Sequence, residues 1–199
     1  MTTRLKNIKI EEKSVLSLFK KYKAVIRFIL TFLVVYITLS VIYSFYLKLS
    51  DGSIFYPDYF TNLVGLQCAA LLEFFGYVIE VVKHPNEPSL KLIINGQYLA
   101  RIIEGCNAFS VIILFASFII AFSTRLKPTL VYVLTGSVFI YIVNLFRITI
   151  LALGMFHYPK YEEVLHNIIF PGIIYGLVFF LWVFWVNMFS NLKMENVES

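Results

Sequence analysis

Three residues that together can carry out acyl transfer lie at the ends of apolar segments. Cys106 precedes one apolar run, Arg147 lies near the end of the next, and His166 opens the last. A thiolate can attack a carbonyl carbon, and an imidazole can exchange a proton near neutral pH. A guanidinium can stabilise the oxyanion that forms. These residue types, in this order, predict nucleophilic catalysis by a cysteine.

The surroundings of Cys106 favour this chemistry. A helix is expected to begin at residue 107, so free N–H groups and the positive end of its dipole would favour the thiolate of Cys106. Removal from water opposes that charge, so a cation is needed, and Arg147 supplies one. An arginine within apolar sequence is costly and indicates function.

Other polar residues are expected to support the site. Asn144 precedes Arg147 by three residues, on the same helix side, and is expected to orient it. Glu104 either pairs with Arg147 or holds the cysteine loop. The supporting set is Asn107, Asn144 and Glu104.

Each residue also has an ordinary structural explanation. A lone cysteine in a membrane helix is usually a packing residue, which is how Cys68 is interpreted. A helix-end arginine usually extends to the membrane interface, and a histidine there is often interfacial. His157 competes with His166 as the base. The proposal of catalysis rests on the expected common depth of all three groups.

The composition indicates a membrane protein. Of 199 residues, 59% are hydrophobic and 15% are charged, against about 45–50% apolar and about 25% charged in soluble domains. The net charge of +5 is concentrated near the N-terminus, which indicates orientation at an anionic lipid surface and not nucleic-acid binding. Two cysteines without a CxxC pair predict neither a disulfide scaffold nor a zinc site.

The apolar runs predict an all-α polytopic fold with about four spanning helices. Residues 60–82 are also apolar, but small and polar groups recur there every three or four residues. We expect a helix lying at the outer interface, or re-entering the membrane, because a carboxylate in lipid is costly. The four predicted spans are residues 28–47, 107–122, 129–153 and 166–188.

A small β-hairpin is predicted just before Cys106. The pair Asn95-Gly96 separates residues 90–94 from residues 97–103, and Asn-Gly between two such runs is typical of a type I′ turn. The hairpin would either anchor the cysteine loop or offer a strand edge to an extended peptide.

The charges predict the topology. Residues 1–27 are basic and are expected in the cytoplasm, as is the loop holding Arg125 and Lys127. Cys106, Arg147 and His166 then meet at the outer face, provided that residues 60–82 make no net crossing. Residues 28–190 would form one membrane domain, and residues 191–199 a cytoplasmic tail.

Three short blocks resemble the motifs of the exosortase/archaeosortase family. They cover roughly residues 93–180, and the order Cys, Arg, His at helix ends is the most specific part. Many members carry Ser-Gly after the cysteine, where this chain has Asn-Ala; the Cys-Asn pair and the short length are most similar to the exosortase F branch. The blocks are Glu104-Gly105-Cys106-Asn107-Ala108, Asn144-Leu145-Phe146-Arg147-Ile148, and His166 followed by Phe170-Pro171-Gly172.

The resemblance implies a membrane-embedded cysteine transpeptidase or protease of the bacterial inner membrane, active at its outer face. Its substrates would be secreted proteins with a C-terminal sorting tail: a recognition motif, one transmembrane helix and a basic cluster. The matching catalytic positions are Cys106 as nucleophile, Arg147 as stabiliser of thiolate and oxyanion, and His166 as proton shuttle. No metal or organic cofactor is implied.

Two other functions fit the same residues. One is a membrane acyltransferase that moves a lipid acyl group through Cys106. The other is a non-catalytic assembly or transport protein, in which Arg147 pairs with Glu73 or Glu80 inside the bundle.

Overall fold

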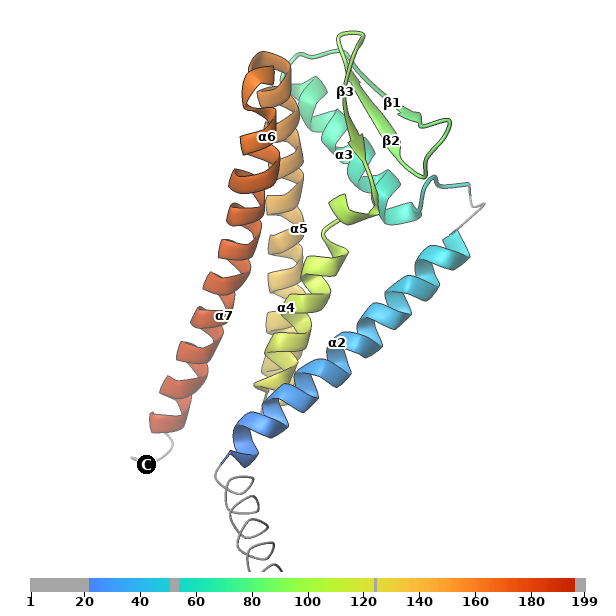
Figure 1. Cartoon of the computed structure of the whole chain (residues 1–199). Helices are drawn as coiled ribbons and strands as arrows, with labels where there is room; N and C mark the ends of the chain where they lie inside the picture. Colours follow the sequence, from blue (N-terminus) through green and yellow to red (C-terminus); the bar gives the residue numbers. More distant parts are fainter. Residues whose placement is uncertain (1–21, 51–53, 124, 196–199) are drawn as a thin grey trace, which may run out of the picture.

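The chain forms a bundle of long helices with a small sheet at one end (Figure 1). This computed structural model describes residues 22–50, 54–123 and 125–195. Its elements are α2 (Lys23–Ser50), α3 (Tyr59–Phe74), β1 (Ile79–Lys83), β2 (Leu90–Ile94), β3 (Gln97–Ile102), η1 (Glu104–Cys106), α4 (Phe109–Ala121), α5 (Leu126–His157), η2 (Pro159–Tyr161), α6 (Glu162–Val164), η3 (Leu165–Ile169) and α7 (Phe170–Glu195).

Among the described residues, three helical segments are long and apolar enough to cross a membrane: Lys23–Ser50, Leu126–His157 and Asn167–Met188. They account for three of the about four spanning helices that the sequence predicts. The segment predicted at residues 107–122 forms α4, which has only 13 residues. At 1.5 Å per residue α4 is about 20 Å long, shorter than a hydrocarbon core of about 30 Å.

The long helices alternate in direction. In Figure 1, α2 and α5 run towards the end that carries the sheet, and α4 and α7 run away from it. We call these two ends the sheet end and the basic end, because Lys23, Arg27, Arg125 and Lys127 belong to the segments at the latter.

The described helices overrun the predicted domain limits. Residue 27 lies inside α2 and residue 190 inside α7. The predicted basic segment lies outside the described residues up to residue 21, and so does the tail beyond residue 195. The apolar helical segment Asn167–Met188 agrees with the span predicted at residues 166–188. Its first turn is the π-helical η3, and α7 follows from Phe170.

Residues 60–82 do not form one helix, which corrects the prediction. Asp58 caps α3 by accepting hydrogen bonds from the N–H groups of Phe60 and Thr61. The helix ends at Phe74, and Gly76 then adopts a φ of +89° that turns the chain. The β-branched run that follows forms strand β1 because β2 offers it a hydrogen-bonding ladder. The face of small and polar residues on α3 therefore ends with the helix, and Glu80 lies on β1 instead.

The sheet confirms the predicted hairpin and adds a strand to it. Its order is β1-β2-β3, with both pairs antiparallel. Ile94 pairs with Gln97 across the turn, where Asn95 and Gly96 have φ values of 51° and 81°. Positive φ at both central residues is the signature of the type I′ turn. A bulge opposite Leu92 and Ile93 shifts the register of β3.

One apolar cluster fixes the sheet to the bundle. Val64 and Cys68 of α3, Leu90 of β2, Ile102 of β3 and Ile148 of α5 are all buried together. Cys106 packs against this cluster. The position of the cysteine loop is thus set by the contact of α3 and α5 with the inner face of the sheet.

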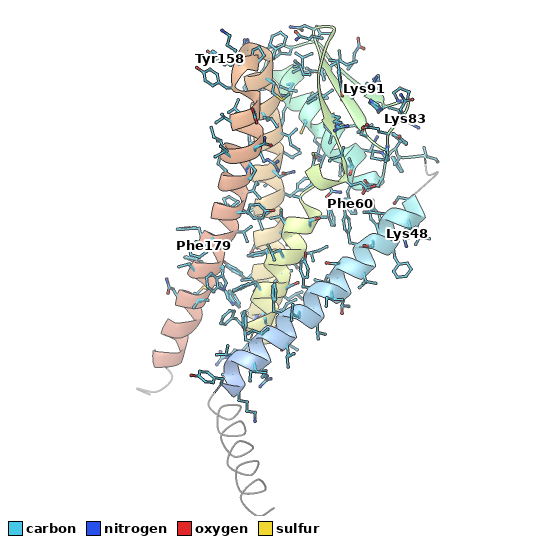
Figure 2. All side chains as sticks on the ribbon, viewed as in Figure 1. Lys48, Phe60, Lys83, Lys91, Tyr158 and Phe179 are labelled. Atoms are coloured by element: carbon cyan, nitrogen blue, oxygen red, sulfur yellow. The ribbon has the colours of Figure 1, made fainter. Side chains whose placement is uncertain are left out.

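Aromatic side chains join the helices below the sheet. The ring of Phe109 at the start of α4 lies 4.2 Å from that of Phe60 on α3 and 5.6 Å from that of Tyr43 on α2, measured between centroids. Phe60 lies at this junction in Figure 2, whereas Phe179 points outwards from the middle of α7. Phe179 is 62% exposed, which suits a lipid-facing surface.

Candidate active site

Cys106 ends a short 3-10 turn and does not lie on a helix. Its N–H donates to the carbonyl of Ile103 at 2.8 Å, and the N–H of Asn107 donates to the carbonyl of Glu104 at 3.4 Å. Helix α4 begins only at Phe109, so the start predicted at residue 107 is wrong. The two N–H groups nearest the sulfur close the turn, and they do not form a free anion site.

Asn107 ties this turn to two helices. Its side-chain amide donates to the hydroxyl of Tyr43 at 2.7 Å and to that of Thr61 at 3.2 Å. Its side-chain oxygen accepts from the N–H of Phe109 at 3.0 Å. Asn107 is fully buried, and its polar atoms are occupied by these contacts. It supports the cysteine by holding the turn, and its amide is not available to a substrate.

Asn144 links the cysteine to the arginine. Its Nδ2 donates to the carbonyl of Cys106 at 2.6 Å, and its Oδ1 accepts from Nη1 of Arg147 at 3.2 Å. Asn144 is only 1% exposed, so both hydrogen bonds are shielded from water. One amide side chain therefore sets the position of the cysteine backbone relative to the guanidinium.

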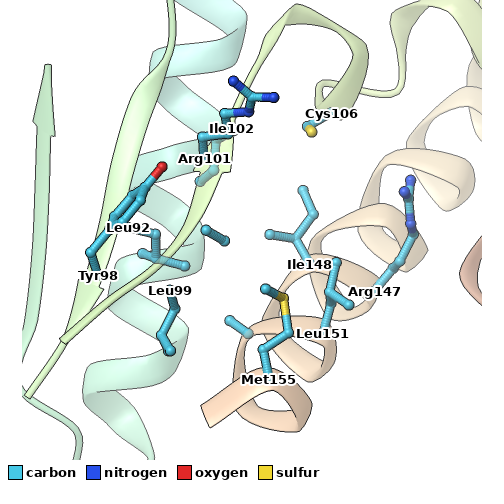
Figure 3. A pocket seen from close by; sticks show the side chains of 12 residues that line it. Leu92, Tyr98, Leu99, Arg101, Ile102, Cys106, Arg147, Ile148, Leu151 and Met155 are labelled. Carbon is cyan, nitrogen blue, oxygen red and sulfur yellow. The ribbon is translucent and has the colours of Figure 1, made fainter. Parts of the chain in front are cut away.

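Cys106 and Arg147 line the same cavity, with Cys106 at one end of it and Arg147 on the α5 side (Figure 3). The cavity has a volume of about 390 Å³ and lies between β3 and α5. Apolar side chains line most of the rest of the cavity wall. The lining residues are Leu92, Tyr98, Leu99, Ala100, Arg101, Ile102, Cys106, Arg147, Ile148, Leu151, Ala152 and Met155.

The guanidinium of Arg147 has an N–H donor that is not used in a hydrogen bond among the described residues. Its Nε is buried and has no hydrogen-bond partner among the described residues. A buried donor without a partner costs about 1–3 kcal/mol, so such groups are rare unless a ligand or water completes them. Arg147 is therefore a suitable donor for a carbonyl oxygen that enters the cavity.

The two histidines differ in their surroundings. His166 lies in the π-helical turn η3, and its side chain is outside what the structure describes. The neighbouring Leu165 packs against Leu151 and Met155, which both line the cavity. His157 is exposed, with Nε2 2.8 Å from the hydroxyl of Tyr77, and is not a lining residue.

The acidic residues considered from the sequence lie outside the bundle interior. Glu104 is half-buried and lines a second depression, with Glu87, Ser89 and Arg101 among its other residues. Glu73 and Glu80 are exposed, on α3 and β1. This placement does not support the transport hypothesis, which requires them to face Arg147 within the bundle.

The two cysteines are in different environments. Cys68 of α3, a helix that is not among the spanning segments, is fully buried, whereas Cys106 is half-buried at the cavity. Burial raises the pKa of the Cys68 thiol to about 12. Cys68 is therefore a packing residue, as expected.

Some cavity residues escaped the sequence analysis. Arg101 of β3 lines the cavity that Cys106 also lines, and its exposed side chain forms an ion pair with Glu87. Nothing in the sequence around Arg101 distinguishes it from an ordinary surface arginine. On α5, Ile148, Leu151 and Met155 follow Arg147 by one, four and eight residues. That spacing places the three side chains on one helix face. This periodicity could have identified them as residues that share a surface with Arg147.

No protein-family model, curated protein or solved structure matches this chain at a significant level. Among the described residues, no group of three or more His, Cys, Asp or Glu side chains is placed to hold a metal ion.

Proposed function

We propose that this protein is a membrane-embedded cysteine transpeptidase or protease, similar to exosortases, that removes C-terminal sorting tails from secreted proteins. The observation that carries the proposal is the shared cavity of Cys106 and Arg147, bridged by Asn144. A half-buried thiol that shares a cavity with a guanidinium carrying an unpaired N–H is suited to attack on a carbonyl.

In the first step the thiol proton of Cys106 passes to His166, and the resulting thiolate attacks the scissile carbonyl carbon. A C–S bond forms, and the carbonyl oxygen becomes an oxyanion that accepts a hydrogen bond from Arg147. When the oxyanion collapses, the C–N bond breaks, and the leaving nitrogen takes a proton from the imidazolium of His166. The products are a thioester on Cys106 and a released tail with a new amino terminus.

In the second step a nucleophile attacks the thioester. Water gives a free carboxylate, whereas an amine on a surface acceptor gives a new amide bond. His166 accepts the proton of the nucleophile in either case, and the thiolate of Cys106 leaves. Arg147 stabilises the second oxyanion as it did the first.

The proposed location is the bacterial inner membrane, with the basic end in the cytoplasm and the sheet end outside. Arg125 and Lys127 connect α4 to α5 at the basic end, and basic residues that flank short loops favour the cytoplasm. Three helices that can span a membrane support the placement in lipid. The partners are membrane lipids and tail-bearing secreted proteins.

The decisive experiment replaces the nucleophile. With Cys106→Ala, we expect co-expressed tail-bearing proteins to accumulate with their tails intact, as measured by mass spectrometry of their C-termini. The matched control is Cys68→Ala, which removes a buried thiol outside the cavity and should leave processing unchanged. Normal processing by a stably inserted Cys106→Ala variant would refute the proposal.

A further inference from the structure

Strand β3 is an edge strand whose free edge borders the cavity. The order β1-β2-β3 gives β3 no strand partner on its far side among the described residues. All five residues from 98 to 102 line the cavity. Because successive side chains of a strand point to opposite faces, five consecutive lining residues indicate that the cavity runs along the edge of β3. Leu92 of the middle strand β2 also lines it, so the cavity extends over the inner face of the sheet.

The opposite wall of this groove is one face of α5. Ile148, Leu151 and Met155 lie along it, as does Arg147, and Cys106 marks one end of the groove (Figure 3). The volume of about 390 Å³ lies within the range of about 300–1,000 Å³ typical of ligand sites. The groove thus has an apolar helix on one side, an unpaired strand edge on the other and the candidate nucleophile at its end.

We propose that the substrate residues before the scissile bond bind in this groove as an added strand, parallel to β3. This inference rests on the proposed function. An unpaired strand edge offers N–H and C=O groups that an extended peptide can satisfy. A lipid chain would fill the apolar wall but would leave those polar groups unpaired, so a peptide is the favoured occupant.

The direction follows from the chemistry. The part of the substrate that becomes the thioester ends at Cys106, so its earlier residues extend away from Cys106, towards Tyr98. Strand β3 runs from Gln97 to Ile102 and then to the cysteine. Both chains therefore run towards Cys106, which is the parallel arrangement.

The same geometry predicts a pattern of specificity. Alternate substrate side chains would face α5 and meet Leu151 and Met155, which favours apolar residues there. The intervening side chains would face the side of Tyr98 and Arg101, which are both exposed. A period of two in side-chain preference is the expected result of strand addition.

The test uses acetyl-tetrapeptidyl chloromethyl ketones with randomised side chains, applied to the full chain in membranes. The thiolate displaces chloride, a C–S bond replaces the C–Cl bond, and mass spectrometry gives the labelling rate at Cys106. We expect tetrapeptidyl probes to label at least tenfold faster than acetyl-aminoacyl probes. A single N-methyl group on either of two alternate amides should slow labelling about fivefold, the effect of one lost hydrogen bond. The same group on either of the other two amides should have little effect.

Labelling that is independent of peptide length or of N-methylation would overturn the groove proposal. Equal labelling by a fatty-acyl chloromethyl ketone would instead identify a lipid as the occupant. Tail processing reports separately on the proposed function. If Cys106→Ala stops tail processing but the labelling rate does not depend on peptide length, only the strand-addition inference is wrong. If tail processing persists in Cys106→Ala but labelling of the unaltered chain follows the period-two pattern, only the proposed peptidase function is wrong.

A second measurement fills the groove. Ala100 packs against Leu151 and Met155, so Ala100→Trp should slow tetrapeptidyl labelling at least tenfold while iodoacetamide labels Cys106 at a rate within twofold of normal. The control Val82→Trp lies on β1, the opposite edge of the sheet, and should leave both rates unchanged. If Ala100→Trp does not fold, the N-methyl scan on the unaltered chain decides the question.

Discussion

At the scale of single residues, the site depends on one amide that makes two different contacts. The carbonyl of Cys106 lies 38 positions from Asn144 in sequence, yet the two share a 2.6 Å hydrogen bond. The other end of the same amide holds Arg147. A charged donor with a fixed direction can stabilise an oxyanion without reorganising during the reaction. Asn144 is thus a positioning residue for both groups.

Replacing Arg147 by lysine tests whether the planar guanidinium matters. Lysine keeps the charge but loses the fork that can bind Asn144 and an oxyanion together. We expect kcat/KM for tail removal to fall about 10²-fold, the effect of losing one oxyanion donor. The control is Arg125→Lys at the other end of α5, which should process normally. Near-normal turnover with Arg147→Lys would indicate that the Arg147 side chain extends to the membrane interface and takes no part in catalysis.

The two thiols should differ sharply in reactivity. Because burial raises the pKa of Cys68 to about 12, only about one molecule in ten thousand carries that thiolate at pH 8, and the side chain is also sealed in the core. At pH 8 we expect iodoacetamide to label Cys106 and not Cys68 in the folded protein, as read by peptide mass spectrometry. Denatured protein, labelled at both positions, is the control; equal labelling of both in the folded protein would contradict the structure.

At the scale of elements, the turn before α4 presents the cysteine. Residue 108 has a φ of +66°, a left-handed conformation that costs an L-residue with a Cβ about 1–2 kcal/mol. The residue is alanine here and is 3% exposed. This conformation separates the 3-10 turn from α4, so Cys106 faces the cavity from a turn and not from a helix.

Enlarging Ala108 should disturb this turn. A β-branched residue is strongly disfavoured at positive φ, so Ala108→Val should lower the free energy of unfolding by about 2 kcal/mol. Thermal melts followed by Trp fluorescence in detergent would measure the change. Ala108→Gly relieves the strain and should stay within about 1 kcal/mol of the parent chain. Ala121→Val, on the same helix in a right-handed conformation, is the control and should cost less than about 1 kcal/mol.

At the scale of the whole molecule, the length of α5 fits the proposed orientation, in which the site lies at one membrane interface. Arg147 follows Leu126 by 21 residues on one continuous helix, or about 32 Å at 1.5 Å per residue. With Leu126 at the cytoplasmic boundary, Arg147 reaches the far side of a hydrocarbon core of about 30 Å. The remaining turns of α5, with α3 and the sheet, then lie above the lipid. In this orientation, a substrate peptide bond located at the membrane interface near Arg147 would be accessible to Cys106.

This orientation predicts which ends can be labelled from outside. In a chain with both native cysteines changed to alanine, Asn86→Cys in the β1–β2 loop should react with a membrane-impermeant maleimide in intact spheroplasts. Lys127→Cys at the basic end should react only after permeabilisation. Both positions are exposed. The reverse pattern would place the candidate site in the cytoplasm and remove secreted proteins as substrates.

Features that depend on local chemistry could be predicted from the residues alone. Asn95-Gly96 specified its turn because few other residues adopt positive φ at two successive positions. The long apolar runs of α2, α5 and α7 specified helices, since a chain in lipid must satisfy its own backbone. The pairing of Asn144 with Arg147 followed from their separation of three residues on one helix.

Features that depend on distant partners became visible only in the folded chain. An apolar run does not say whether it is a helix or a strand, and residues 79–83 became β1 because β2 offered them a ladder. The contact of Asn144 with Cys106 and the groove between β3 and α5 join segments about 40 residues apart. Such contacts arise from the packing of the sheet on α3 and α5, which no local preference of the backbone encodes.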